Sequence, residues 1–115
     1  MSQSATTTPT TTPCLEIAVY DVHTSALDEF PAQQVAVHDA LRAVPGFIAS
    51  ERLQGLSTPT LFADYITWAS RESAEAAAAQ MAVMPVAAGF MASIRTMRTF
   101  AHLPVQPSTS GEGGL

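Results

Sequence analysis

Asp64 is the residue of this chain whose type and position could do chemistry. It lies in a segment typical of a strand, where side chains alternate between two faces. Phe62, Asp64, Ile66 and Trp68, the only tryptophan, therefore share one face, so an acid stands on an otherwise apolar surface. Burial of an unpaired carboxylate is costly, so Asp64 must be paired, kept neutral or placed on a solvated cavity. Such an acid can take a proton from a substrate, and we predict Asp64 and Trp68 as catalytic residues.

His38 is the third predicted catalytic residue, because the ordinary pKa of histidine lies near neutrality. It follows Val37 on the first predicted helix, where it could line a pocket between helix and sheet and carry protons. His23 and His102 are expected in loops or on the surface. The three histidines lack the sequence spacing of metal ligands, so no metal site is predicted.

Two of these residues also have a purely structural interpretation. Trp68 ends a strand and can fill the core without any catalytic role. Asp64 can form an ion pair with Arg52 across a predicted hairpin, or with Arg98 on a neighbouring strand. Such a pair would explain why a carboxylate is tolerated there.

Several further side chains are candidates for contact with a substrate. Phe62 and Ile66 flank the acid on its strand. Met81 and Met84 are either adaptable core fillers or the walls of a pocket for a flat aromatic ring. Arg98 either meets a carboxylate or anchors an anionic substrate. The predicted substrate-binding residues are therefore Phe62, Ile66, Met81, Met84 and Arg98.

Composition excludes several classes of protein. The net charge is −5, there is no lysine, and the five arginines are scattered, so a nucleic-acid partner is not expected. The single cysteine, Cys14, cannot form an internal disulfide and fits a reducing compartment. No apolar run reaches the length of a membrane-spanning helix, and the Thr-rich start does not resemble a secretory signal. We therefore expect a cytoplasmic protein without a membrane partner.

The elements that must position the candidate residues follow from hydrophobic periodicity and turn residues. Residues 1–13 and 104–115 are polar and rich in turn formers, and are predicted to be disordered tails around one domain, 14–103. We expect the elements of this domain in the order strand, helix, strand, strand, helix, strand. The expected strands are 15–22, 47–53, 60–68 and 94–103; the helices begin near Pro31 and after the N-cap Ser70, and a looser helical turn spans 87–91.

This order predicts an α+β, ferredoxin-like sandwich. Two β-α-β units in a row give a four-stranded antiparallel sheet with both helices on one face. The opposite face would carry Leu61, Ala63, Tyr65 and Thr67, which are too apolar to remain fully wet. We therefore expect a homodimer through the open sheet face, in which two sheets close a dimeric α+β barrel.

Two motifs resemble one family. The Pro45-Gly46-Phe47 junction and the run Tyr65-x-x-Trp68-x-Ser70-Arg71-Glu72 are similar to the antibiotic biosynthesis monooxygenases, dimeric α+β barrels, over residues 14–103. Some members oxidise phenolic polycyclic substrates to quinones with dioxygen, using neither metal nor flavin. In those, an asparagine is implicated at the position that Asp64 occupies here. Haem-degrading relatives need a histidine within the stretch matching Ala76 to Met81, which has none.

The resemblance implies a cofactor-independent monooxygenase that acts on an aromatic or polyketide-like small molecule. Trp68 would form an apolar wall, Asp64 would orient or deprotonate a phenol, and His38 could relay a proton. Two alternatives stay open. One is a non-catalytic barrel protein that binds a small ligand or has a structural role. The other is an isomerase or cyclase on the same fold.

Overall fold

The computed structural model describes residues 12–107. Most of the two predicted tails, 1–13 and 104–115, lies outside the described residues. The chain forms four strands and three α-helices, with a short 3₁₀ turn at Thr24–Ala26. The elements are β1 (Cys14–Val22), α1 (Phe30–Leu41), β2 (Phe47–Gln54), β3 (Leu61–Trp68), α2 (Arg71–Met81), α3 (Pro85–Ser93) and β4 (Ile94–Pro104).

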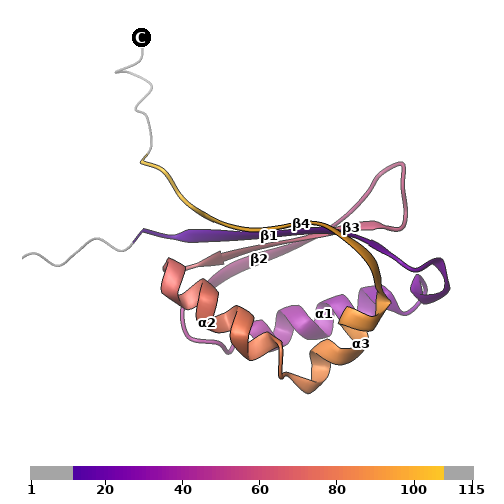
Figure 1. Cartoon of the computed structure of the whole chain (residues 1–115), viewed down its shortest axis with the longest axis horizontal. Coiled ribbons are helices and arrows are strands. Elements are labelled where there is room, and N and C mark those ends of the chain that lie inside the picture. The colour runs from indigo at the N-terminus through magenta and orange to yellow at the C-terminus, as the bar shows by residue number, and fades with distance from the viewer. Residues whose placement is uncertain (1–11, 108–115) are drawn as a thin grey trace, which may run out of the picture.

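The four strands form one antiparallel sheet in the order β2-β3-β1-β4. All three helices lie on one side of it (Figure 1). This is the predicted α+β, ferredoxin-like arrangement. The central pair, β1 and β3, sets Ala18 opposite Asp64 and Tyr20 opposite Phe62, so their side chains share the helix-facing side. In a single chain the sheet is open and does not close into a barrel.

The helix boundaries follow local chemistry, with one correction. Pro31 stands in the first turn of α1, as predicted. Ser70 is the N-cap of α2, and its Oγ accepts a hydrogen bond of 3.0 Å from the backbone N–H of Ser73. The looser turn predicted at 87–91 is instead the nine-residue helix α3. Pro85 stands in the first turn of α3, a position that proline favours.

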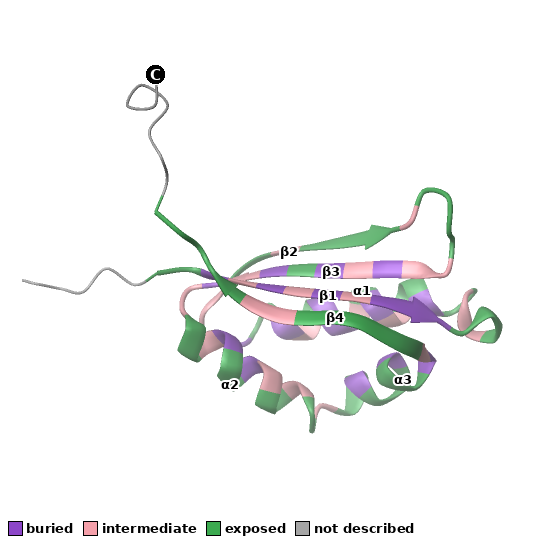
Figure 2. Cartoon of the chain, turned by 45° about the horizontal axis from the view of Figure 1, so that its top comes forward, coloured by how far each residue is buried: buried purple, intermediate pink, exposed green. Residues whose placement is uncertain are grey.

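The core lies between the sheet and the helices, and burial alternates along β3 (Figure 2). Its aromatic centre is formed by Tyr20, Phe30, Phe62 and Phe90. The Phe30 ring centroid lies 4.8 Å from that of Phe62 and 5.3 Å from that of Phe90. These rings fix the β1–β3 pair against α1 and α3, and so hold the helix-facing side chains of both strands in place.

Three further findings bear on the predicted location and partners. The edge strands β2 and β4 are mostly exposed in a single chain (Figure 2). The open sheet face carries the partly exposed or exposed side chains of Leu61, Ala63, Tyr65 and Thr67, as predicted. Within residues 12–107 no single helix is long and apolar enough to cross a membrane; α2 and α3 reach that length only as a pair bent by 85°.

Candidate active site

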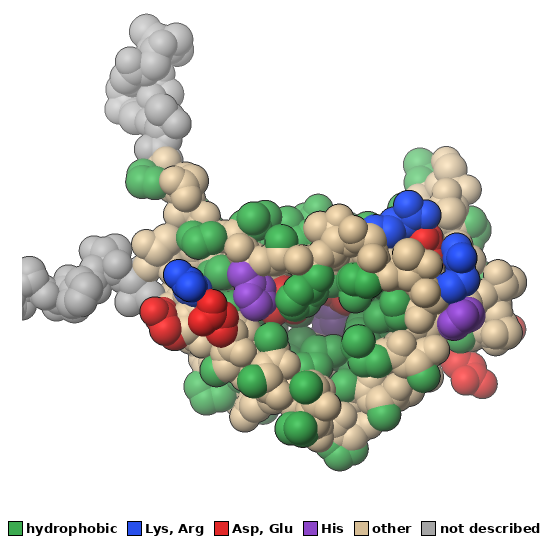
Figure 3. All heavy atoms as spheres, in the orientation of Figure 1, with side chains coloured by type: hydrophobic (Ala, Val, Ile, Leu, Met, Phe, Trp, Pro, Cys, Tyr) green, Lys and Arg blue, Asp and Glu red, His purple; other side chains and the backbone are tan. Residues whose placement is uncertain are grey.

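A cavity of about 680 Å³ lies between the sheet and the helices α2 and α3. Its wall is mostly alanine, methionine and other apolar side chains, and exposed Met91, Met97 and Phe100 are among them. Figure 3 shows a hollow at this place, rimmed by hydrophobic side chains, with acidic and histidine side chains visible inside it. The volume is that of a typical small-molecule site.

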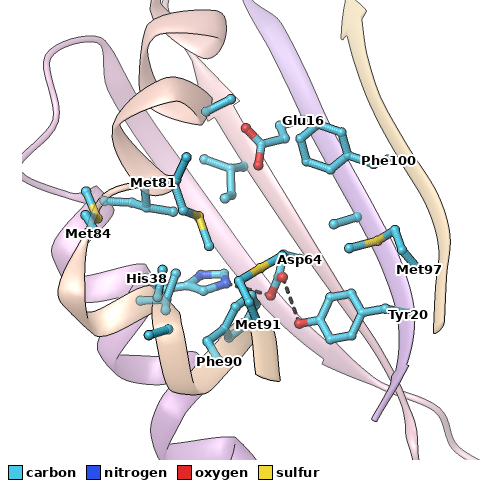
Figure 4. Close-up of a pocket in the computed structure, with 18 of the residues that line it drawn as sticks. Glu16, Tyr20, His38, Asp64, Met81, Met84, Phe90, Met91, Met97 and Phe100 are labelled. Carbon is cyan, nitrogen blue, oxygen red and sulfur yellow. Dashed lines mark hydrogen bonds and ion pairs between the residues drawn. The ribbon is translucent and has the colours of Figure 1, made fainter. Parts of the chain in front are cut away.

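The polar part of this wall is centred on Asp64. Tyr20 Oη donates to Asp64 Oδ2 at 2.8 Å, while Gln34 Nε2 donates to Asp64 Oδ1 at 2.8 Å. His38 Nε2 lies 2.8 Å from the same Oδ1. Figure 4 shows Asp64 between Tyr20 and His38. All four residues are at most 5% exposed, so the carboxylate is buried among three hydrogen-bond partners.

The structural alternative, an ion pair between Asp64 and Arg52 or Arg98, is not formed. Arg52 stands opposite Asp64 in the β2–β3 register, yet it is exposed and forms no ion pair with it. Arg98 instead donates from Nε to Asp21 Oδ2 at 2.6 Å. Neutral donors and an imidazole stabilise the Asp64 carboxylate, and the alternative of a structural arginine pair does not apply.

The His38 ring is held at both nitrogen atoms. Nδ1 lies 3.0 Å from Ser50 Oγ, and Nε2 faces Asp64. With a neutral ring, Nε2–H donates to Asp64 and Nδ1 accepts from the Ser50 hydroxyl, which fixes the tautomer. The ring is therefore held in one orientation in the cavity wall between α1 and the sheet.

Tyr20 remains a neutral donor in this cluster. Burial, and then the charge of Asp64, raise the pKa of the Tyr20 phenol well above its ordinary value. Its hydroxyl proton therefore stays on Tyr20 Oη and is committed to Asp64.

A second buried acid, Glu16, lines the same cavity on β1. Trp68 Nε1 donates to Glu16 Oε1 at 3.2 Å, and His102 Nε2 lies 3.4 Å from that oxygen, outside hydrogen-bond geometry. Burial raises the pKa of the Glu16 carboxyl above its ordinary value, and the charge of Asp64 adds to this. The charge of His102 and the hydrogen bond from Trp68 lower this pKa.

Comparison with known proteins agrees with this architecture. The family model described as antibiotic biosynthesis monooxygenase matches residues 13–83, more than half of the chain. The chain belongs to the antibiotic biosynthesis monooxygenase family. No protein with a curated description matches it significantly.

Solved structures share the fold of this family member at low sequence identity. SnoaB, a cofactor-independent oxygenase from Streptomyces nogalater, is 18% identical with a TM-score of 0.68; 86% of this chain and 96% of SnoaB are covered. An antibiotic biosynthesis monooxygenase assigned in Bordetella bronchiseptica is 12% identical with a TM-score of 0.71, over 85% of this chain and 99% of that one. A Chloroflexus aurantiacus protein of the same assignment is 18% identical with a TM-score of 0.66, over 84% and 97%. At these identities the likeness establishes the fold.

The cavity of this monooxygenase-family chain brings together some of the predicted site residues. Asp64, His38, Ile66, Met81 and Met84 all line it. Its described residues include no group of three His, Cys, Asp or Glu side chains arranged to hold a metal.

Phe62, Trp68 and Arg98 do not line the cavity, which corrects the predicted set. Phe62 belongs to the aromatic core and packs against Phe30. Trp68 is fully buried, packs edge-to-face on Phe47, and reaches the site only through Glu16. Arg98 is bound to an acid elsewhere on the sheet.

Sequence reasoning missed four polar residues of the site: Glu16, Tyr20, Gln34 and His102. His102 was expected on the surface, yet its side chain is only 19% exposed and faces Glu16. Two signals were present in the sequence. Gln34 is an amide within the apolar stripe of α1, and Glu16 alternates with Ala18 and Tyr20 on one face of β1. A polar residue in an apolar stripe requires a buried partner.

Proposed function

We propose that this protein is an oxygenase that converts a hydroxylated polycyclic aromatic compound to a quinone with dioxygen. In this reaction a ring CH₂ loses two hydrogens, or a ring C–H and a phenol O–H lose one each. One oxygen atom becomes the new carbonyl, and the other leaves as water with those hydrogens. The electrons that reduce dioxygen come from the deprotonated substrate, so the protein supplies proton transfer, orientation and a dry pocket.

The observation that carries this proposal is the polar cluster on the wall of an apolar cavity. An ionised carboxylate offers about four acceptor positions, and protein donors occupy three of those on Asp64. The fourth is available to a hydroxyl of a bound ligand. Family membership and the fold shared with SnoaB support the same reaction class.

The charge of the cavity indicates the ligand class. Among residues 12–107, Glu16 and Asp64 are the only carboxylates that line it, and no arginine does. Hydroxyl groups can donate to these acids, whereas a carboxylate on the ligand would be repelled. A neutral phenolic compound therefore fits better than the anionic substrate that Arg98 was predicted to anchor.

An oxygen electrode tests this proposal with dithranol, a dihydroxyanthrone, as the probe. We expect uptake well above the uncatalysed rate. Met97→Trp should lower the acceleration, because Met97 lines the cavity and a larger ring there narrows it. Leu56→Trp is the matched control, since Leu56 is fully exposed on the β2–β3 connection. No acceleration by the wild type would contradict the proposal, and turnover without dioxygen would favour an isomerase or cyclase.

We also propose that the open sheet face binds a second copy of the chain. The face presents Leu15, Ile17 and Val19 of β1 beside the apolar side chains of β3, all at least partly exposed in one chain. An apolar sheet face of this extent is typical of an interface. Two sheets packed on this face would close a barrel and leave both cavities on its outside, under the helices.

A further inference from the structure

The cavity contains two carboxylates whose surroundings differ. Glu16 on β1 and Asp64 on β3 lie on the same side of neighbouring strands, because Ala18 is the residue opposite Asp64. Figure 4 shows Glu16 beside Phe100, and Asp64 further along the same wall between His38 and Tyr20. Two acids held in one site by different partners are the arrangement in which one acid stays ionised and the other exchanges a proton.

We propose that Glu16 is the group that accepts the substrate proton, while Asp64 is a positioning residue. The proposal rests on the proposed function, and it assigns the proton transfer to an acid that the sequence-based set of catalytic residues did not include.

The contacts of Asp64 argue against its acting as the proton acceptor. Tyr20, Gln34 and His38 all donate to it when the His38 ring is neutral, and both of its oxygens are engaged. Protonation of Asp64 would remove the negative charge that strengthens all three of these buried hydrogen bonds. The cluster therefore holds Asp64 ionised and uses it to fix His38 and Tyr20.

The contacts of Glu16 leave it able to gain and lose a proton. Among the described residues its one hydrogen bond, from Trp68, goes to Oε1, so Oε2 remains for a ligand. Glu16 lines the cavity and is 7% exposed. The titratable groups around it are Asp64 on β3, His102 on β4 and the Cys14 thiol on β1. Helix α2 adds only apolar side chains to the lining, Ala78 and Met81.

The proton step balances as follows. Glu16 Oε2 forms an O–H bond with the proton of a substrate hydroxyl or of the acidic ring CH₂, and the electron pair of the broken bond stays on the substrate. The substrate anion reduces dioxygen and forms a C–O bond, which gives a peroxide anion. Glu16 returns its proton to that peroxide, and loss of water then yields the carbonyl. Glu16 is thus restored at the end of each turnover.

Trp68 provides a readout that does not depend on turnover. It is the only tryptophan and donates to Glu16, so its emission should change as Glu16 gains a proton. We expect a transition above pH 4.5, the ordinary value for glutamate, with far-UV circular dichroism unchanged. Glu16→Gln should abolish it. Asp64→Asn should lower the midpoint and His102→Gln should raise it. A transition that survives in Glu16→Gln would overturn the proposal.

Anaerobic binding of dithranol tests the proton transfer itself. We expect the red-shifted absorbance of the dithranol anion with the wild type and with the exposed-loop control Leu56→Trp, and its absence with Glu16→Gln. With dioxygen, Glu16→Gln should lower kcat about a hundredfold with little change in the dithranol Kd. Ionisation that persists in Glu16→Gln, or none in the wild type, would overturn the proposal. Ionisation without oxygen uptake would instead contradict only the oxygenase function.

Discussion

The phenol of Tyr20 and the carboxylate of Asp64 form a 2.8 Å hydrogen bond diagonally across the two central strands. The Tyr20 ring also packs edge-to-face on Phe30 and Phe90, with centroids 5.8 Å apart in each pair. One residue therefore joins the aromatic core to the polar wall of the cavity. Because the ring is locked by packing, the position of the donor, and with it that of Asp64, is fixed before any ligand binds.

Removal of this hydroxyl should destabilise the protein. In Tyr20→Phe the ring contacts remain and Asp64 Oδ2 loses its donor, so the free energy of unfolding should fall by about 1 to 3 kcal/mol. Ser57→Ala is the control, because it also removes a hydroxyl but Ser57 is exposed on the β2–β3 connection and should change stability by less than about 0.5 kcal/mol. Urea unfolding measures both. Equal losses in the two variants would contradict the buried hydrogen bond.

Glu16 should make stability depend on pH. Its pKa is raised in the folded protein above the ordinary 4.5, so the folded state binds the proton more tightly than the unfolded chain. The resulting stabilisation is fully present below pH 4.5 and is lost as the pH rises through the folded pKa. The Glu16→Gln variant has no carboxyl group to titrate at this position, so it does not lose this stabilisation. Its stability relative to the wild type should therefore increase with pH across that window. Urea unfolding at a series of pH values measures the difference; a constant difference would contradict the raised pKa.

Gly46 should tolerate no side chain. It has a positive φ of 91°, and a Cβ there would collide with the Ser73 side chain in the first turn of α2. Gly46→Ala should lower the free energy of unfolding by at least about 1 kcal/mol. In Gly89→Ala, within α3, the new Cβ meets only the flexible end of Gln33 at 3.1 Å. The helix propensity of alanine should make that change neutral or stabilising by up to about 1 kcal/mol. Thermal unfolding of the two variants checks the contrast.

The proposed dimer predicts a contrast between two surface residues. Tyr65 on the open sheet face and Val35 on α1 are each 37% exposed in a single chain, on opposite sides of the molecule. Tyr65→Asp should convert the dimer to a monomer, since it would bury a charge in an apolar interface, while Val35→Asp should leave the dimer intact. Light scattering after gel filtration gives the masses. A monomeric wild type, or a dimeric Tyr65→Asp, would contradict the interface.

The sequence predicted which side chains share a face more reliably than which of them touch. Strand periodicity placed Asp64 and Ile66 on the helix-facing side, and helix periodicity placed His38 near them; the structure agrees in each case. Alternation is a property of the backbone, so one segment is enough to predict it.

The partners of the acids could not be read in the same way. Arg52 was the obvious partner of Asp64, because the β2–β3 hairpin places them opposite one another. Its side chain stays in solvent, where a charge is well hydrated, while the buried donors Tyr20 and Gln34 need an acceptor. That choice depends on β1 pairing with β3, a contact between strands distant in sequence. The same pairing brings Trp68 to Glu16 and removes it from the cavity wall.

The measurement that tests the central claim most directly is the incorporation of isotope-labelled dioxygen into dithranol, followed by mass spectrometry of the quinone. The wild type should place one labelled oxygen atom in the new carbonyl at a rate well above that in buffer. Glu16→Gln, whose cavity is otherwise unchanged, should incorporate label about a hundredfold more slowly. A product that takes its oxygen from water, or labelling no faster than without protein, would contradict the assignment of this cavity as the site of an oxygenase.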